Sequence, residues 1–162
     1  RKGNGLILSK SIKMNTSLAN MKGISNGQVI DADKEYAVAE EYRKKLKTKC
    51  PSVEQNVGNL SGGNQQKVLL AKWMFAEPDI LILDEPTRGI DVGAKYEIYC
   101  IINDLVAAGK SVIMISSELP EVLGMSDRIY IMNEGKFVGE VSKEEATSEL
   151  IMSKIVKSGK GA

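Results

Sequence analysis

The chain has 162 residues, a length that suits a single domain. Its 22 basic side chains nearly balance 21 acidic ones, and the net charge of +1 argues against a general nucleic-acid-binding surface. Cys50 and Cys100 lack the CxxC spacing of a metal site, and no apolar run is long enough to span a membrane. We therefore expect a cytoplasmic protein in a reducing compartment, without a signal peptide.

The first part of the sequence, residues 1–78, predicts mostly helix. Residues 15–21 form a short candidate helix, and residues 31–49 form an amphipathic one with a basic end. Its expected apolar face consists of Tyr36, Ala39, Tyr42 and Leu46. Basic residues in a last turn complement the helix dipole, which favours a solvated helix end over a nucleic-acid patch.

A Ser-Gly-Gly turn at residues 61–63 stands directly before a second helical run. Backbone N–H groups and the helix dipole attract anions at a helix N-terminus. Gly62 and Gly63 let the backbone approach a bulky phosphate, and the Ser61 hydroxyl can donate one more hydrogen bond. The alternative at this position is an ordinary serine N-cap with a flexible entrance.

An aliphatic run, ILIL at residues 80–83, ends in two adjacent carboxylates, Asp84 and Glu85. Such a run predicts a strand buried on both faces of a parallel sheet, and its carboxyl end is where open α/β sheets bind ligands. There Asp84 can hold Mg²⁺, and Glu85 can polarise an attacking water for phosphoryl transfer. A surface charge pair, the alternative, fits poorly with the aliphatic residues that precede it.

The next residues predict a helix over 92–108 and a second buried strand over 111–116. Gly109 is expected to close that helix. Tyr96 and Tyr99 fall at helical spacing with its apolar residues, so we expect them in the core rather than stacked on a nucleotide.

The C-terminal part predicts a helix after Pro120 and a hairpin, followed by one more helix. The hairpin strands, 128–132 and 136–141, flank a turn-forming Asn-Glu-Gly. Ser142 and Glu145 form a capping box that is expected to begin the last helix, which ends near residue 156 before a frayed tail.

A phosphate-binding P-loop is missing from the sequence. Residues 58–63 match the first half of the GxxxxGK[ST] pattern, but Asn64 and Gln65 follow where Lys and Ser or Thr are required. No strand is predicted before this stretch, and no other stretch fits the pattern.

Three motifs, in this order, resemble those of ATP-binding-cassette (ABC) ATPases. LSGGNQQK at 60–67 is similar to their signature, ILILDEP at 80–86 to their Walker B strand, and RGID at 88–91 to their D-loop. The resemblance implies an α/β class, partial P-loop NTPase (ABC ATPase) fold whose Walker A loop and first strands would lie upstream. It divides the chain into a helical signature subdomain, 1–78, and the C-terminal part of the parallel-sheet core, 79–162.

The family's layout implies roles for individual residues. Two nucleotide-binding domains sandwich ATP, so the signature turn would contact the γ-phosphate of ATP held by another domain, and the D-loop would lie between the domains. By this resemblance the ATP-contacting residues are Ser61, Gly62, Gly63, Gln65, Asp91 and Ser117. Asp84 would bind Mg²⁺, and Glu85 would be catalytic. Ser117 stands where the family usually has a His, and this sequence contains no His.

The stretches 84–99 and 115–129 resemble one branch, the second nucleotide-binding domain of tandem ATPase subunits that power ribose-, xylose- and galactose-type monosaccharide importers. The resemblance implies an ATP-hydrolysing parent on the cytoplasmic face of the membrane, with permease subunits as partners. Whether the chain alone is an enzyme stays open. The alternative is a regulatory half that lends its signature to a partner site without hydrolysing ATP.

Two further expectations follow from the resemblance. A translation- or chromosome-associated relative is disfavoured because the basic insertions or long coiled coils of such proteins are missing from the sequence. The strands at 80–83 and 111–116 would lack neighbours in an isolated chain, so we expect that chain to self-associate.

Overall fold

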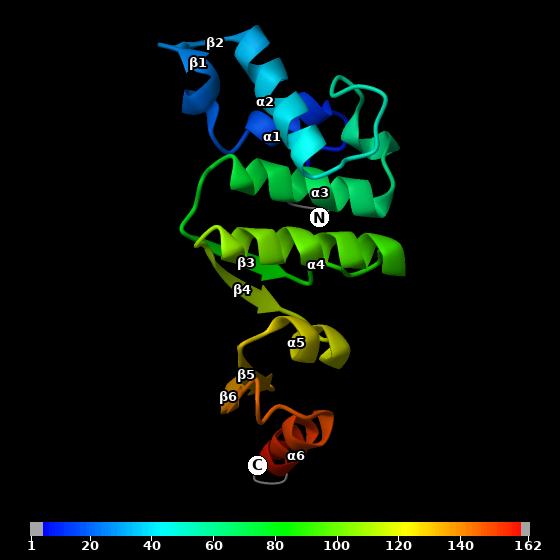
Figure 1. The fold of residues 1–162 in the computed structure, drawn as a ribbon, viewed down its shortest axis with the longest axis vertical. Coiled ribbons are helices and arrows are strands. Elements are labelled where there is room, and N and C mark those ends of the chain that lie inside the picture. The colour runs from blue at the N-terminus through cyan, green and yellow to red at the C-terminus, as the bar shows by residue number, and fades with distance from the viewer. Residues whose placement is uncertain (1–4, 160–162) are drawn as a thin grey trace. The chain divides into compact units, whose positions relative to one another are not determined.

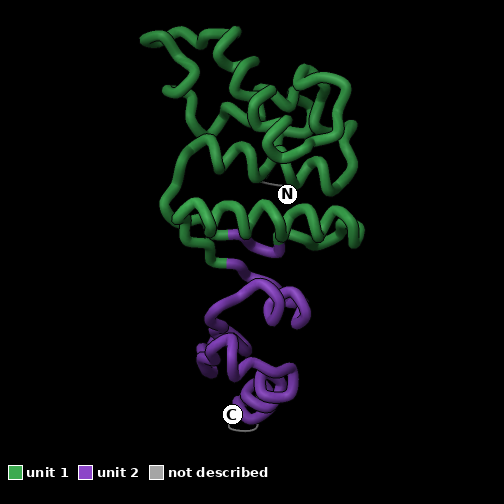
Figure 2. The backbone as a smooth tube through the Cα atoms, viewed as in Figure 1, with its two compact units in different colours: residues 1–82, 86–113 green, residues 83–85, 114–162 purple. Residues whose placement is uncertain are grey.

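A computed structural model describes residues 5–159 of the chain (Figure 1). These residues form two compact units, coloured separately in Figure 2. The first unit contains the described residues up to 82 together with 86–113, and the second contains 83–85 and the described residues from 114 onward. No helix within 5–159 has the length and apolar character needed to cross a membrane.

The first unit is mainly helical. Its helices are α1 (Ile12–Ser17), α2 (Ala32–Lys45), α3 (Gly62–Met74) and α4 (Val92–Ala107), with the short 3-10 helices η1 (Met21–Ile24) and η2 (Val57–Asn59). A small hairpin joins β1 (Ser25–Asn26) to β2 (Val29–Ile30). The core between α1, α2 and α3 contains Leu6, Ile12, Ala39, Val53, Val57, Leu60 and Val68.

The helix α2 begins where the sequence predicts it. The Asp31 side chain caps it by accepting hydrogen bonds from the backbone N–H groups of Asp33 and Lys34. These bonds, chiefly the one from Lys34, hold the pKa of Asp31 below its ordinary value. The prediction for Tyr36 is wrong, because this side chain is 44% exposed, whereas Ala39 is buried.

Two strands, β3 (Ile80–Asp84) and β4 (Ser111–Ile115), form a sheet of their own. The backbone N–H of Ser111 donates to Asp79 O, and that of Glu85 donates to Ile115 O, so the strands run in the same direction. Both strands lie where they are predicted.

The predicted burial of β3 and β4 on both faces is wrong. In β3, Leu81 and Leu83 are buried whereas Ile82 is 63% exposed. In β4, Ile113 and Ile115 are also exposed. The reason is that the packing of this sheet is one-sided: nothing within residues 5–159 covers these isoleucine side chains.

The helix α4 ends as predicted, with Gly109 in the left-handed conformation at φ 83°. Its inward face is formed by Ile98, Ile101 and Ile102. Tyr96 lies on the other side of the helix and is 69% exposed, so its predicted place in the core is wrong.

The second unit contains α5 (Leu119–Met125), the antiparallel hairpin β5 (Arg128–Asn133) and β6 (Lys136–Ser142), and α6 (Ser148–Gly159). Glu134 and Gly135 both adopt positive φ in the two-residue hairpin turn, as the turn chemistry predicts. The core on the α6 side contains Ile129, Ile131, Val141 and Ile151.

The predicted start of the last helix is wrong. Ser142 and Glu145 do form a hydrogen bond, but residues 143–145 form a turn and the helix begins only at Ser148. The Thr147 hydroxyl caps α6 instead, accepting the Leu150 backbone N–H at 3.1 Å. The helix continues past 156 to Gly159, and the rest of the predicted tail lies outside the described residues.

Candidate functional site

The Ser-Gly-Gly turn forms the N-terminus of α3. Ser61 is in an extended conformation and caps the helix, as the alternative of a serine N-cap expects. Gly62 and Gly63 form the first turn, where backbone amides and the helix dipole create a positive end. Ser61 is exposed, so a cap and a phosphate-binding turn are compatible in one residue.

The start of α3 lies against the start of α4, which runs beside it (Figure 1). A Cβ on Gly63 would lie 2.6 Å from the Cβ of Ala94, so only glycine permits this approach. Asp91 caps α4 by accepting the Ala94 backbone N–H at 2.9 Å. Two capped helix N-termini therefore meet at one place.

A hollow of about 280 Å³ lies at this meeting point, and we call it the signature hollow. It is lined by Lys49, Ser61, Gly63, Asn64, Asp91, Gly93, Ala94 and Glu97. The structure thus brings together three residues that the sequence assigns to ATP contacts: Ser61, Gly63 and Asp91. The positive helix ends and Lys49 favour an anion here. The lining also contains two carboxylates, Asp91, which caps α4, and Glu97, which is paired with Lys67.

A buried lysine on α3 forms an ion pair with a residue of α4. Lys67 on α3 is 2% exposed, and its Nζ lies 2.9 Å from Glu97 Oε2 on α4 and donates to Lys47 O at 2.9 Å. A buried cation needs such partners because leaving it unpaired is costly. The ion pair links α3 to α4 through Glu97, which itself lines the hollow.

Gly62 and Gln65, the other two signature residues assigned to ATP, do not line the hollow. Gln65 faces inward. Its side chain is buried and donates to Leu60 O at 3.0 Å and to Val57 O at 3.4 Å, which holds the segment that leads into α3. It does not line the signature hollow, whereas Asn64 does. Sequence analysis missed Asn64 and Lys49; the signal for Asn64 was its place three residues after the capping serine.

The carboxylates at the end of β3 lie in the second unit. Glu85 adopts a left-handed conformation at φ 47°, and its backbone N–H donates to Ile115 O at 2.8 Å. Its Oε1 accepts the Ser117 backbone N–H at 3.0 Å. The structure therefore brings Glu85 and Ser117 together at the carboxyl ends of both strands, through the Ser117 main chain rather than its hydroxyl.

Asp84 is the exposed last residue of β3. No cluster of three or more His, Cys, Asp or Glu residues that could hold a metal ion occurs among residues 5–159. A single carboxylate at a strand end fits Mg²⁺ binding of the kind in which waters and substrate phosphates supply the other ligands.

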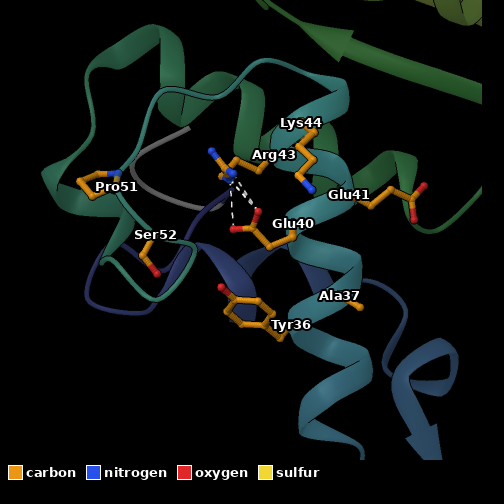
Figure 3. A pocket seen from close by; sticks show the side chains of 8 residues that line it. All are labelled: Tyr36, Ala37, Glu40, Glu41, Arg43, Lys44, Pro51 and Ser52. Carbon is orange, nitrogen blue, oxygen red and sulfur yellow. Dashed lines mark hydrogen bonds and ion pairs between the residues drawn. The ribbon is translucent and has the colours of Figure 1, made fainter.

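A larger hollow of about 730 Å³ lies between α2 and the loop at residues 51–52 (Figure 3). Arg43 and Glu40 form a bidentate ion pair within it, with N–O distances from 2.8 to 3.0 Å. None of the residues predicted to bind ATP or Mg²⁺ lines this hollow.

Comparison with protein families gives a match to the ABC transporter family over residues 4–88. The L-arabinose transport ATP-binding protein AraG of Geobacillus stearothermophilus is 62% identical over 97% of this chain and 31% of its own length. The xylose import ATP-binding protein XylG of Geobacillus kaustophilus and the ribose import ATP-binding protein RbsA of Clostridium tetani are each 56% identical over 94% of this chain. The chain spans about 30% of the length of these relatives.

Solved structures show the same fold. A metal-chelate-type ABC transporter in an inward-facing conformation matches with a TM-score of 0.77 at 17% identity, over 92% of this chain and 59% of its own. The dimeric ATP-binding cassette MJ0796 bound to ADP and Pi matches with a TM-score of 0.72 at 22% identity, over 85% of this chain and 59% of its own. The predicted partial ABC ATPase fold is confirmed.

Proposed function

Because this chain belongs to the ABC transporter family, we propose that it is part of the ATP-binding, ATP-hydrolysing subunit of a monosaccharide importer. More narrowly, we assign it to the C-terminal portion of the second nucleotide-binding domain of a tandem subunit. The names of the arabinose, xylose and ribose relatives support the class of cargo. Nothing in these relatives favours the alternative of a half that hydrolyses no ATP.

The observation that carries this proposal is the signature hollow. Ser61 and Gly63 present a hydroxyl and the positive end of α3 to the same space that Asp91 and the start of α4 line. A triphosphate carries the negative charge that such paired helix ends bind. We propose that the hollow contacts the γ-phosphate of ATP held by another nucleotide-binding domain.

The residues at the carboxyl end of β3 would bind Mg²⁺ and activate the attacking water. ATP supplies the phosphoanhydride bond, and Mg²⁺, when bound, neutralises phosphate charge. Asp84 would hold the ion, and Glu85 would orient the attacking water and accept its proton. The Ser117 N–H bond to Glu85 Oε1 leaves the other carboxylate oxygen for that water.

The proposal also names partners and a location. We propose a second nucleotide-binding domain as the partner across the ATP, transmembrane permease subunits as the partners that move the sugar, and no nucleic acid. The subunit would lie on the cytoplasmic face of the membrane. Sugar specificity would then belong to other subunits, since no residue described here would meet the sugar.

Replacing Ser61 by alanine tests the function assigned to the hollow. In the full-length subunit reconstituted with its permease, Ser61→Ala is expected to lower the rate of ATP hydrolysis about ten- to a hundredfold, because a hydrogen bond to a charged group contributes roughly 1.5–3 kcal/mol. Thr147→Ala is the matched control, since it removes a helix-capping hydroxyl in the second unit and is expected to leave hydrolysis unchanged. A Ser61→Ala subunit with the unaltered rate would contradict the proposal.

The exposed isoleucines of β3 and β4 support self-association of the isolated chain. Light scattering after size exclusion is expected to give a mass above the 17.6 kDa of one chain, rising with concentration. Ile82→Lys should lower that mass by placing a charge on the uncovered face, whereas Val92→Lys, at an exposed position on α4, should not. A mass of one chain at all concentrations would contradict this expectation.

A further inference from the structure

We propose that Asn64 is a positioning residue whose side-chain amide turns the hydroxyl proton of Ser61 into the signature hollow. This inference rests on the proposed function, because it concerns how the same hollow holds a phosphate. It assigns a role to a side chain that sequence analysis left out.

Three contacts define the arrangement around Asn64. Its Nδ2 donates to Ser61 Oγ at 2.9 Å, and its backbone N–H reaches the same oxygen at 3.5 Å. Its Oδ1 accepts the Lys49 backbone N–H at 2.8 Å. The side-chain bond to Ser61 is therefore shorter than the bond that caps the helix.

The chemistry of these partners fixes which way the amide faces. A backbone N–H can only donate, so the atom of Asn64 that meets Lys49 must be the carbonyl oxygen. The NH₂ group must then face Ser61, and the two Asn64 donors occupy the acceptor positions of the Ser61 oxygen.

A serine hydroxyl has one proton to donate and two acceptor positions. With its acceptor positions occupied by Asn64, the Ser61 hydroxyl is left to act as a donor. Within residues 5–159 this hydroxyl donates no hydrogen bond, and Ser61 lines the hollow. Donors that bond to the oxygen also polarise the O–H bond, which strengthens its donation to an anion.

The same amide anchors a second part of the lining. By accepting the Lys49 N–H, Asn64 fixes the backbone of Lys49, which lines the hollow together with Ser61. A cation held at the rim complements a phosphate. One side chain thus sets both the direction of a donor and the place of a charge.

Asn64→Asp separates this role from a structural one. The carboxylate still accepts the Lys49 N–H, but it has no N–H for Ser61 and accepts the Ser61 proton instead, turning that proton away from the hollow. An acidic side chain in the first turn of a helix favours the helix, so the thermal unfolding midpoint should stay the same or rise. ATP hydrolysis by the full-length subunit is nevertheless expected to fall about tenfold, in kcat more than in KM.

Two further variants complete the test. Asn64→Gln keeps the amide and is expected to retain hydrolysis within about threefold of the unaltered subunit. Asn64→Ala is expected to lower hydrolysis about fivefold alone but to have no further effect in a Ser61→Ala background, because it acts through Ser61.

The outcomes distinguish this inference from the proposed function. If Ser61→Ala lowers hydrolysis while Asn64→Asp leaves it unchanged, the positioning role is overturned and the proposed function stands. If Asn64→Asp lowers the unfolding midpoint together with kcat, the residue is structural and the inference is again overturned. If Ser61→Ala itself has no effect on hydrolysis, the proposed function is contradicted, and the inference about Asn64, which rests on it, is overturned as well.

Discussion

Replacing Glu85 by glutamine in the full-length subunit is expected to lower ATP hydrolysis about a hundredfold or more, because a general base contributes roughly that much to a rate. Glutamine has the same shape and can still accept the Ser117 N–H through its amide oxygen, so the turn after β3 should keep its conformation. An amide cannot accept the proton of an attacking water. ATP binding, measured separately by calorimetry, is expected to persist.

The chain offers a matched control for this substitution at the other end of the same strand. Glu77 also has a positive φ, 52°, and is exposed in the segment between α3 and β3. Glu77→Gln neutralises a carboxylate of the same kind without touching the carboxyl end of β3, so hydrolysis should be unchanged. Equal rates for Glu85→Gln and the unaltered subunit would show that Glu85 is not the base.

Local chemistry explains why some features could be predicted from the sequence. The Ser61 cap depends on a hydroxyl and the next helical turn, and the Glu134-Gly135 turn depends on two positive φ angles. Both arise from residues that are neighbours in the chain, so spacing alone identifies them. The same is true of Glu85, because a carboxylate after an aliphatic run marks a strand end.

Burial could not be predicted in the same way. An aliphatic run predicts a strand, but whether both faces are covered depends on elements far away in the sequence, and Ile82 remains exposed. Helical spacing placed Tyr96 with apolar residues, yet the face of α4 that packs is the one carrying Ile98. Periodicity identifies an amphipathic element without identifying which of two apolar stripes meets the core.

In the candidate site, too, the sequence predicts the motif but not which of its side chains line the hollow. Motif similarity assigned Gln65 to ATP, but the helical turn places that side chain inward and places Asn64 in the hollow. Successive side chains along a helix point in directions that differ by about 100°, so neighbouring signature residues lie on different faces of α3. Lys49 could not be found from the sequence, because the eleven residues between it and Ser61 must fold back before the two line the same hollow.

Replacing Gly63 by alanine is expected to destabilise the 162-residue chain by about 1–3 kcal/mol, the usual cost of forcing extra volume into a packed contact. The new Cβ would lie 2.6 Å from the Ala94 Cβ, so α3 and α4 must separate. Separation strains the Lys67–Glu97 ion pair and widens the signature hollow. Urea unfolding followed by circular dichroism measures the stability, and ATP hydrolysis by the full-length subunit should fall with it.

The helix that faces Gly63 provides both the control and the rescue. Gly93 is likewise the second residue of its helix, but a Cβ there would meet only Asp91 Oδ1 at 3.4 Å, so Gly93→Ala should be tolerated. Ala94→Gly removes the methyl that Gly63→Ala would strike, at a cost of about 1 kcal/mol for glycine in a helix. In that background Gly63→Ala should cost less than about 0.5 kcal/mol, because sites in direct contact give non-additive effects. Additive costs would show that the close approach of the two helices does not explain the glycine at position 63.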